Sequence, residues 1–366
     1  MSITALRLAS LAALILAAHA AHAAPATGQL NDTGIDKCET PNGTLHTNCA
    51  DSLQDADTGR DVTEPANADG RLGFKWTKLA ADGSALPASA TQWSCIADQV
   101  TGLVWEMKST DGTIHDASRR WSNGDGADID AAGLVSASNA EHLCGRSDWR
   151  LPARGELQGI VDYSQATPGP TVDAAWFPNS DGYSFWTSTV QANNPEGVRW
   201  YVNFQDGWTG QIYNSYAFGE ARVVSGTLVE GSPRYQVSVD GQEVFDTRTG
   251  LTWARCTLGQ NWDGTTCVGK PFNFTWRKAL AAGARAAAKT GEAWRVPNAK
   301  EFASIAVDGQ ADPDVDATLF PNSSSRLYWT SSPYVGVPFY AWTFYGYDGT
   351  INFENMLGQH LVRLVR

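Results

Sequence analysis

Short segments in which apolar and polar residues alternate recur along the chain and predict half-buried β-strands, because alternation puts one strand face into a core. The predicted strands are residues 73–79, 102–106, 184–188, 198–204, 221–224, 327–331, 339–345 and 361–365. Two of them lead into the Asp-Gly pairs at Asp206-Gly207 and Asp348-Gly349. Asp-Gly after an alternating strand is typical of a β-hairpin, so both segments are predicted to turn back as antiparallel pairs.

Helical patterns stand between the strands. Residues 130–144 are predicted to form a helix closed by Gly145, and residues 276–289 one closed by Gly291, since glycine readily takes the left-handed conformation at a helix end. The second of these is rich in Ala, which favours helix strongly. Two shorter helices are predicted to end near Val161 and Ile305.

The shorter helices begin in a motif that occurs twice, Trp-Arg-x-Pro-x-x-x-Glu at residues 149–156 and 294–301. The sequences around the two copies also match, in the same order. The offset drifts from 148 at Gly102 and Gly250, through 145 at the motif, to 143 at Trp186 and Trp329. Such ordered self-similarity indicates an internal duplication.

The residue types of the motif suit a helix start. Pro in the first turn sacrifices no hydrogen bond, and Asn298 with Glu301 three residues later has the form of a capping box. Arg150 and Arg295 could pair with a carboxylate, and the repeated Trp residues are interpreted as core anchors. The predicted structural set is Trp149, Arg150, Pro152, Glu156, Trp294, Arg295, Pro297, Glu301, Trp186 and Trp329.

One repeat unit is thus a strand, two helices and a set of antiparallel strands whose last member returns beside the first. That order predicts an α+β domain. The predicted organisation is a signal peptide at 1–23, an Asp/Gly-rich arm at 24–70, a first domain at 71–229, a linker at 230–234 and a second domain at 235–366.

The N-terminal segment predicts export. Residues 1–23 hold one Arg, an apolar run and small residues before the predicted cleavage point, which is typical of a secretory signal peptide and too short for a membrane span. The protein is therefore expected to be secreted, periplasmic or at the cell surface. No later apolar run is long enough to cross a bilayer.

Export changes the interpretation of the six Cys. In an oxidising compartment they are expected to form disulfides, and although six Cys allow 15 pairings, we predict pairing between sequence neighbours. The predicted pairs are Cys38 with Cys49, Cys95 with Cys144, and Cys256 with Cys267.

Charge narrows the range of partners. The chain has a formal net charge of −12, and loss of the one Arg in the signal peptide makes it −13. Such a chain repels polyanions, which argues against nucleic acid and leaves sulfated sugars to a local basic patch. The 15 Trp and 35 Gly residues fit an extracellular domain of short strands and aromatic loops.

With these residues in view, both copies resemble the Lcl C-terminal domain family. The resemblance rests on Thr-Gly-Leu-x-Trp, Trp-Arg-x-Pro-x-x-x-Glu, Phe-Pro-Asn, Trp-Thr-Ser and a final Val-Arg, which is Ala221-Arg222 in the first copy. It implies two tandem, disulfide-stapled domains related to the C-type-lectin-like fold, each with two helices and a small antiparallel sheet. It also implies a secreted or surface binding module, associated in one adhesin with sugar polymers and cell attachment.

Catalytic and metal signatures are weak. The four His that remain after export, His46, His115, His142 and His360, have no zinc-site spacing, and no Gly-x-Ser-x-Gly elbow is present. No cofactor is predicted. Asp55, Asp57 and Asp61 are spaced as in a calcium loop but lack the distal Glu of an EF-hand, so a solvated acidic turn is the favoured interpretation and a calcium site the alternative.

Positions where the two copies differ are the candidate ligand contacts, since duplication preserves core residues. Flat aromatic faces beside polar groups suit sugar rings or a protein partner equally. The candidates near the hairpins are Trp200, Tyr201, Trp208, Tyr213, Tyr216, Tyr340, Trp342, Tyr345 and Tyr347. The alternative is that half of them are interior strand residues.

These observations favour an exported, non-catalytic tandem binding protein that recognises a glycan or a surface protein at the cell envelope, with two linked copies raising avidity. One alternative is a structural or assembly subunit of a pilus or envelope complex. Another is an enzyme of the formylglycine-generating type, because Trp-Arg-x-Pro is similar to a stretch of that family. That chemistry needs redox-active Cys, whereas these six are expected to be bridged.

Overall fold

The computed structural model describes residues 29–59, 62, 69–70, 72–123, 130–165, 168–213, 219–226 and 233–366. The predicted signal peptide and most of the predicted linker lie outside these ranges.

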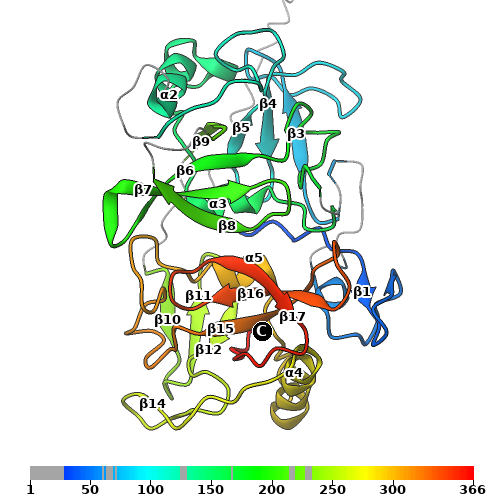
Figure 1. Cartoon of the computed structure of the whole chain (residues 1–366), viewed down its shortest axis with the longest axis vertical. Helices are drawn as coiled ribbons and strands as arrows, with labels where there is room; N and C mark the ends of the chain where they lie inside the picture. The colour runs from blue at the N-terminus through cyan, green and yellow to red at the C-terminus, as the bar shows by residue number, and fades with distance from the viewer. Residues whose placement is uncertain are drawn as a thin grey trace, which may run out of the picture.

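Two α+β domains are stacked on one another, and the N-terminal arm runs between them to one side of the second domain (Figure 1). Within the described ranges no helix has the length and apolar character needed to cross a membrane.

Within the residues that the structure describes, the first domain has two antiparallel sheets and two α-helices. One sheet has the order β3-β4-β5-β9 and the other β6-β7-β8. The closing strand β9 pairs with β5, which confirms that the last strand returns beside the first. The elements are β3 (Trp76–Leu79), β4 (Cys95–Asp98), β5 (Val104–Glu106), α2 (Ala131–Ala140), α3 (Arg154–Gly159), β6 (Ser184–Gln191), β7 (Asn194–Asn203), β8 (Thr209–Tyr213) and β9 (Val224–Ser225).

The second domain repeats this arrangement. Its sheets are β10-β11-β12 and β15-β16-β17, beside a small β13-β14 hairpin, and Val365 bridges Trp253 where the first domain has β9 against β5. The elements are β10 (Tyr235–Val237), β11 (Glu243–Asp246), β12 (Thr252–Ala254), β13 (Asn261–Trp262), β14 (Cys267–Val268), α4 (Trp276–Thr290), α5 (Ala299–Ala303), β15 (Leu327–Pro333), β16 (Tyr340–Tyr345) and β17 (Ile351–Asn355).

The repeated motif acts as a lock at the start of α3 and α5. Arg150 makes two hydrogen bonds of 2.7 Å to the Glu156 carboxylate, and Arg295 makes two of 2.6 Å to Glu301. Paired bonds of this fork geometry are strong and specify orientation. The motif therefore ties the segment before each helix to the first turn of that helix.

Two expectations about the helices need correction. Each motif helix begins two residues after its Pro, with Ala153 and Asn298 as caps, so Pro152 and Pro297 precede the helix. The helix expected to reach Cys144 ends at Ala140, and both His142 and Cys144 have positive φ. Cys144 is bonded to Cys95, and the chain must leave the helix for its sulfur to reach that strand. By contrast, α4 ends at the left-handed Gly291 as predicted.

Buried polar groups recur at equivalent positions of the two domains. Trp186 donates its indole N–H to the Trp121 carbonyl and Trp329 to that of Phe274, both at 2.7 Å. The buried Arg222 and Arg363 each donate to carbonyls at the end of the neighbouring strand. These Trp and Arg residues are therefore part of the interior. Their hydrogen bonds offset the cost of burying their polar groups.

The three disulfides are those predicted: Cys38–Cys49, Cys95–Cys144 and Cys256–Cys267. All six Cys are used. Three such bridges fit an oxidising compartment.

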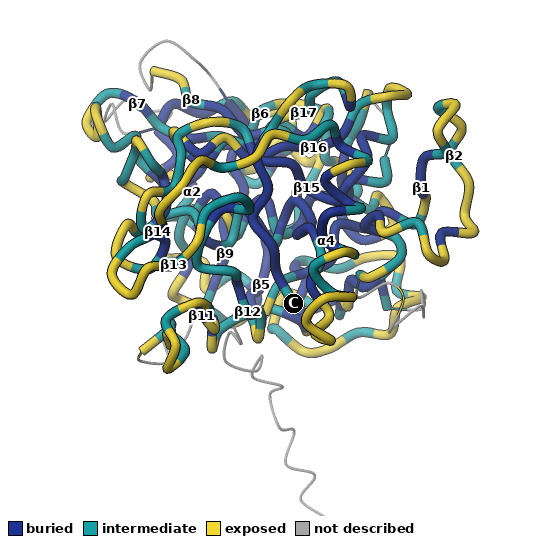
Figure 2. The backbone as a smooth tube through the Cα atoms, turned by 90° about the horizontal axis from the view of Figure 1, so that it is seen from below, coloured by how far each residue is buried: buried dark blue, intermediate teal, exposed yellow. Residues whose placement is uncertain are grey.

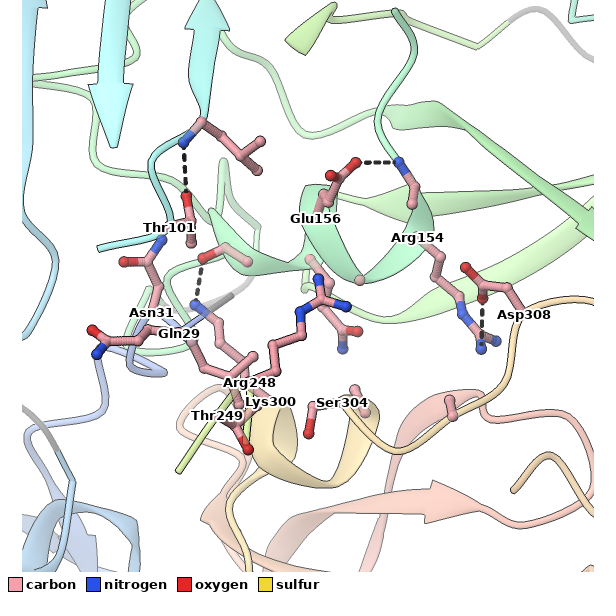
Figure 3. Close-up of a pocket in the computed structure, with 18 of the residues that line it drawn as sticks. Gln29, Asn31, Thr101, Arg154, Glu156, Arg248, Thr249, Lys300, Ser304 and Asp308 are labelled. Carbon is pink, nitrogen blue, oxygen red and sulfur yellow. Dashed lines mark hydrogen bonds and ion pairs between the residues drawn. The ribbon is translucent and has the colours of Figure 1, made fainter. Parts of the chain in front are cut away.

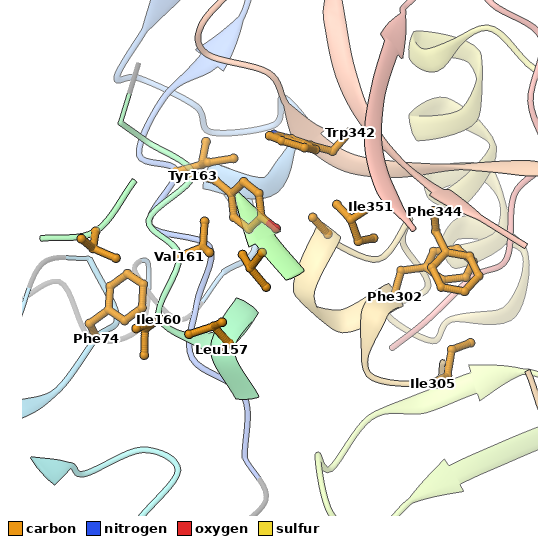
Figure 4. Packing of buried hydrophobic residues seen from close by; sticks show 14 of the residues in the cluster. Phe74, Leu157, Ile160, Val161, Tyr163, Phe302, Ile305, Trp342, Phe344 and Ile351 are labelled. Atoms are coloured by element: carbon orange, nitrogen blue, oxygen red, sulfur yellow. The ribbon is translucent and has the colours of Figure 1, made fainter. Parts of the chain in front are cut away.

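A single hydrophobic core passes from one domain into the other. It includes Leu157 and Tyr163 of the first domain and Phe302, Trp342 and Ile351 of the second, and Figure 4 shows the Tyr163 ring beside Trp342. Their ring centroids are 4.7 Å apart. Buried backbone runs through the middle of the molecule and exposed loops lie at its rim (Figure 2). The two copies are therefore packed as one body rather than joined as independent modules.

The N-terminal arm is part of that body. Asp55 is 1% exposed, and its carboxylate accepts hydrogen bonds from the hydroxyls of Thr33 and Ser332. Glu39, in the hairpin of β1 (Cys38–Glu39) and β2 (Leu45–His46), accepts from the Phe339 amide. The interpretation of Asp55 as part of a solvated turn is therefore wrong, since its carboxyl group is buried against the second domain.

Trp342→Ala tests the shared core. The ring is fully buried between the domains, so its removal is expected to lower the free energy of unfolding by about 3–5 kcal/mol. Leu357→Ala is the matched control, because Leu357 is 79% exposed and should change stability by less than about 0.5 kcal/mol. Urea unfolding measures both, and equal small losses would contradict an interdomain core.

Candidate functional site

A cavity of about 230 Å³ lies between the two domains. Its walls come from α3, from α5, from the arm at residues 29–31 and from the loops that hold Thr101 and Arg248. Figure 3 shows these side chains gathered between the two helices. At ~30 Å³ per water molecule, this space is far too small for a folded partner and suits a small molecule or one unit of a polymer.

Arg154, at the start of α3, crosses to the second domain. Its guanidinium is 3.0 Å from the Asp314 carboxylate and 3.2 Å from that of Asp308, and it donates to the Asp348 carbonyl. The cation also lies over the Trp200 ring, 4.1 Å from its centroid. Each of these groups helps to offset the loss of hydration of a charge that is only 4% exposed.

Lys300, in the first turn of α5, crosses in the opposite direction. Its ammonium donates to the Asp32 carbonyl at 2.6 Å and to the Gly159 carbonyl at the end of α3 at 2.8 Å. It also lies 4.5 Å from the centroid of the Phe74 ring. Burial lowers the pKa of Lys300 to about 7. This one side chain therefore joins the arm, the first domain and the second domain.

Two further cations line the cavity. Arg234 is paired with Asp246 at 2.8 Å and donates to the Ser304 carbonyl. Arg248 is half-buried, and burial together with the neighbouring Arg234 lowers the pKa of its guanidinium. Across the described ranges, no hydrogen bond or ion pair joins that guanidinium to another residue. Among the residues that the structure describes, Arg248 thus has unpaired donors at the cavity wall.

The side chains that line the cavity include more basic than acidic groups. Four cationic side chains, Arg154, Arg234, Arg248 and Lys300, face two carboxylates, Glu156 and Asp308, within a chain of net charge −12. Glu156 is already held by Arg150. Because Arg154 and Arg234 are paired with carboxylates and the pKa of Lys300 is lowered to about 7, Arg248 is, among the described residues of the wall, the cation best placed to attract an anion at short range.

Asn31 adds a buried acceptor to the wall. Its amide group donates to Asp98 at 2.6 Å, while its carbonyl oxygen has no hydrogen-bond partner among the described atoms. The residue is only 3% exposed. An unpaired buried oxygen costs free energy, and a hydroxyl donor of a ligand in the cavity would satisfy it.

The aromatic residues predicted as ligand contacts do not form one surface. Trp200 and Trp342 are 4% and 0% exposed, so the prediction is wrong for both, because each packs at the contact between the domains. Tyr201, Trp208 and Tyr340 are half-buried. Tyr213, Tyr345 and Tyr347 are exposed, and Tyr216 lies outside the described residues.

The candidate calcium residues have separate partners. Asp55 is bonded to hydroxyl groups, whereas the Asp57 carboxylate accepts from the amides of Asp51 and Leu53. Asp61 lies outside the described residues. Within the described ranges, no group of three or more His, Cys, Asp or Glu side chains is placed to hold a metal ion.

The residues assigned to structure are placed in the interior or in the motif locks. Trp149, Trp186 and Trp329 are at most 2% exposed and Trp294 is 9% exposed. The carbonyls of Pro152 and Pro297 accept the amides of Ser188 and Ser331 at equivalent positions. Glu156 has a second place, since it also lines the cavity.

Sequence reasoning missed Asn31, Arg154, Arg248, Lys300 and Asp308. One signal was available for two of them: Arg154 and Lys300 stand in the first turn of a helix, where the helix dipole disfavours a cation. A basic residue at such a position indicates a partner elsewhere that outweighs the dipole. Here the partners lie across the domain contact.

The fold and cavity define a two-domain, disulfide-bridged α+β protein with an arginine-lined cavity between its repeats. The family model of the Lcl C-terminal domain matches residues 94–224 and again residues 242–366, so the chain belongs to the Lcl C-terminal domain family in two copies. A comparison with the curated proteins finds no match.

Lys300→Met tests the buried ammonium. The pKa of Lys300 is about 7 in the folded protein and about 10.4 in an unfolded chain, so the unfolded state binds more protons between these values. Stability contributed by this group therefore rises with pH. From pH 7 to 9 the wild type is expected to gain about 2 kcal/mol relative to Lys300→Met, measured by denaturant unfolding.

The control for this series is Lys289→Met, because Lys289 is exposed at the end of α4. Its unfolding free energy should follow that of the wild type at every pH. Parallel curves for the wild type and Lys300→Met would show that the ammonium is not buried as described.

Proposed function

We propose that this protein is an exported, non-catalytic binding protein of the cell envelope, and that the cavity between its two domains holds an acidic group of a glycan. The observation that carries the proposal is Arg248, a half-buried guanidinium without a partner in the described residues. Recognition of an acidic surface polymer in this way would serve adhesion.

The chemistry of the cavity supports an acidic ligand. A guanidinium presents donors in a planar fork that matches a carboxylate or sulfate. Placing such an anion beside Arg248 would offset the repulsion from Arg234, which together with burial lowers the pKa of Arg248. The unpaired Asn31 oxygen would accept a hydroxyl from the same sugar unit. One sugar residue with an acid group would supply both the anion for Arg248 and the hydroxyl for Asn31.

The packing favours one site per chain rather than two equivalent ones. Because Trp200 and Trp342 are buried at the contact between the domains, the hairpins cannot act as two independent binding faces. We infer that the duplication created the cavity by opposing α3 and α5, and that each half is a variant of the C-type-lectin-like fold. Simple avidity from two linked copies is therefore not part of the proposal.

The alternatives receive less support. An enzyme of the formylglycine-generating type needs redox-active thiols, and all six Cys here are in disulfides. A subunit of an envelope assembly would need a docking face. The exposed pair Tyr345 and Tyr347, with ring centroids 5.8 Å apart, is the feature that favours it.

Arg248→Gln tests the proposal. Isothermal titration calorimetry with oligogalacturonides, as uronic acid probes, is expected to detect binding to the purified wild type. Loss of the charged fork should weaken this binding by about tenfold or more, equivalent to about 1.4 kcal/mol. The melting temperature should stay close to that of the wild type, because the side chain supports no described contact of the fold.

Arg285→Gln is the matched control, since Arg285 is exposed on α4 and should leave the affinity unchanged. Binding should also weaken as salt concentration rises. If neither oligogalacturonides nor sulfated oligosaccharides bind, or if Arg248→Gln binds as tightly as the wild type, the proposal fails.

A further inference from the structure

A second and separate cavity, of about 540 Å³, lies within the first domain. Its wall includes Trp93, Lys108, Thr113, His115 and Asn179, none of which touches the cavity between the domains. Most of these residues come from the segment just before β4 and from the loop that follows β5. An inference drawn from this cavity is therefore independent of the function proposed above.

A buried carboxylate anchors the wall. Glu106 is fully buried, and its carboxylate accepts from the Lys108 ammonium at 2.9 Å, from His115 at 2.7 Å and from the Val223 amide at 2.9 Å. Burial by itself would raise the pKa of Glu106, but Lys108 and His115 hold it below its usual value. Glu106 thus stays charged and holds the two basic groups in place.

The second domain shows that the fold does not require this cluster. At the offset of 148 residues, Ala254 stands in place of Glu106 and Cys256 in place of Lys108. That domain secures the following segment with the Cys256–Cys267 disulfide instead. A loop can therefore be fixed at this point without burying any charge. Since buried ion pairs add little net stability over apolar packing, the cluster in the first domain calls for another role.

In the described part of the chain, the Lys108 ammonium has hydrogen-bond donors left for a ligand. An ammonium has three donors, and in the described part of the chain the Lys108 ammonium has one partner, Glu106. The side chain is 3% exposed and lines the cavity. Its backbone is held as well, because Asn179 donates to the Lys108 carbonyl at 3.0 Å. Lys108 thus presents free donors from a fixed position.

Trp93 is also fixed at the wall. Its indole N–H donates to the Trp176 carbonyl at 3.2 Å, and the Lys78 ammonium lies 3.6 Å from the centre of its ring. An immobilised aromatic ring beside aligned donors binds with little loss of conformational entropy. Sites that bind sugar rings commonly combine an aromatic face with polar groups.

The charges at this wall favour a neutral ligand. Glu106 and Glu141 pair with Lys108 and His115, so the cationic groups are balanced. The exposed Asp111 at the rim would repel an anion. We propose that this cavity of the first domain is a binding site for a neutral sugar ring, with Trp93 as the stacking face and Lys108 as the donor to ring hydroxyls.

Saturation-transfer NMR and calorimetry with methyl glycosides of neutral hexoses and N-acetylhexosamines test this assignment. At least one of these probes is expected to bind the wild type, and Trp93→Leu and Lys108→Met should each weaken it by about tenfold or more. Lys75→Met is the matched control, because Lys75 is an exposed lysine of the same domain and should leave binding unchanged.

Lys108→Met leaves Glu106 with fewer partners and could destabilise the domain. Thr113→Trp avoids this problem, since Thr113 is exposed at the rim and a bulky side chain there should block the cavity without disturbing Glu106. Arg248→Gln should bind the neutral probes normally, which separates this site from the acidic one. Binding of none of the probes, or undiminished binding by the Thr113→Trp variant, would overturn the assignment.

Discussion

The structure depends on an exchange of buried cations between the two repeats. Arg154 of α3 is inserted among the carboxylates of the second domain, and Lys300 of α5 is inserted against the carbonyl end of α3 and the arm. Neither charge could remain buried without these partners. The exchange therefore sets how α3 and α5 face each other, and the cavity between the domains is a consequence of that arrangement.

The contact between the two domains uses equivalent positions of the two repeats, but the residues at those positions differ in chemistry. Tyr163 and Asp308 are 145 residues apart, the same offset as the two motifs, and each crosses to the opposite domain, Tyr163 to Trp342 and Asp308 to Arg154. The arm adds a further asymmetry, since Asp55 occupies beside Ser332 the place that Asp308 takes beside Thr189. A duplicated scaffold has thus produced a single site with unlike walls.

Features that depend on interactions between residues close in sequence could be predicted, whereas features that depend on long-range contacts could not. Strands, hairpins and the end of α4 rest on local patterns, and they were placed nearly correctly. The early end of α2 was missed because a disulfide over 49 residues overrides local helix propensity. The hairpin residues Trp200 and Trp342 were misjudged for a similar reason: a strand pattern shows which side chains share a face, but not what covers that face.

By itself, the sequence determined the duplication and the family, and it indicated neighbour pairing of the Cys and helix starts at the two motifs. Each of these depends on residue identity and short spacing, or on matching two copies of one pattern. Only the tertiary structure decided that the copies share a core, that Glu39 and Asp55 of the arm are buried and that Arg248 and Lys300 meet at one cavity. These features join residues far apart in the chain, and their energies come from desolvation and pairing, which exist only after the domains have packed.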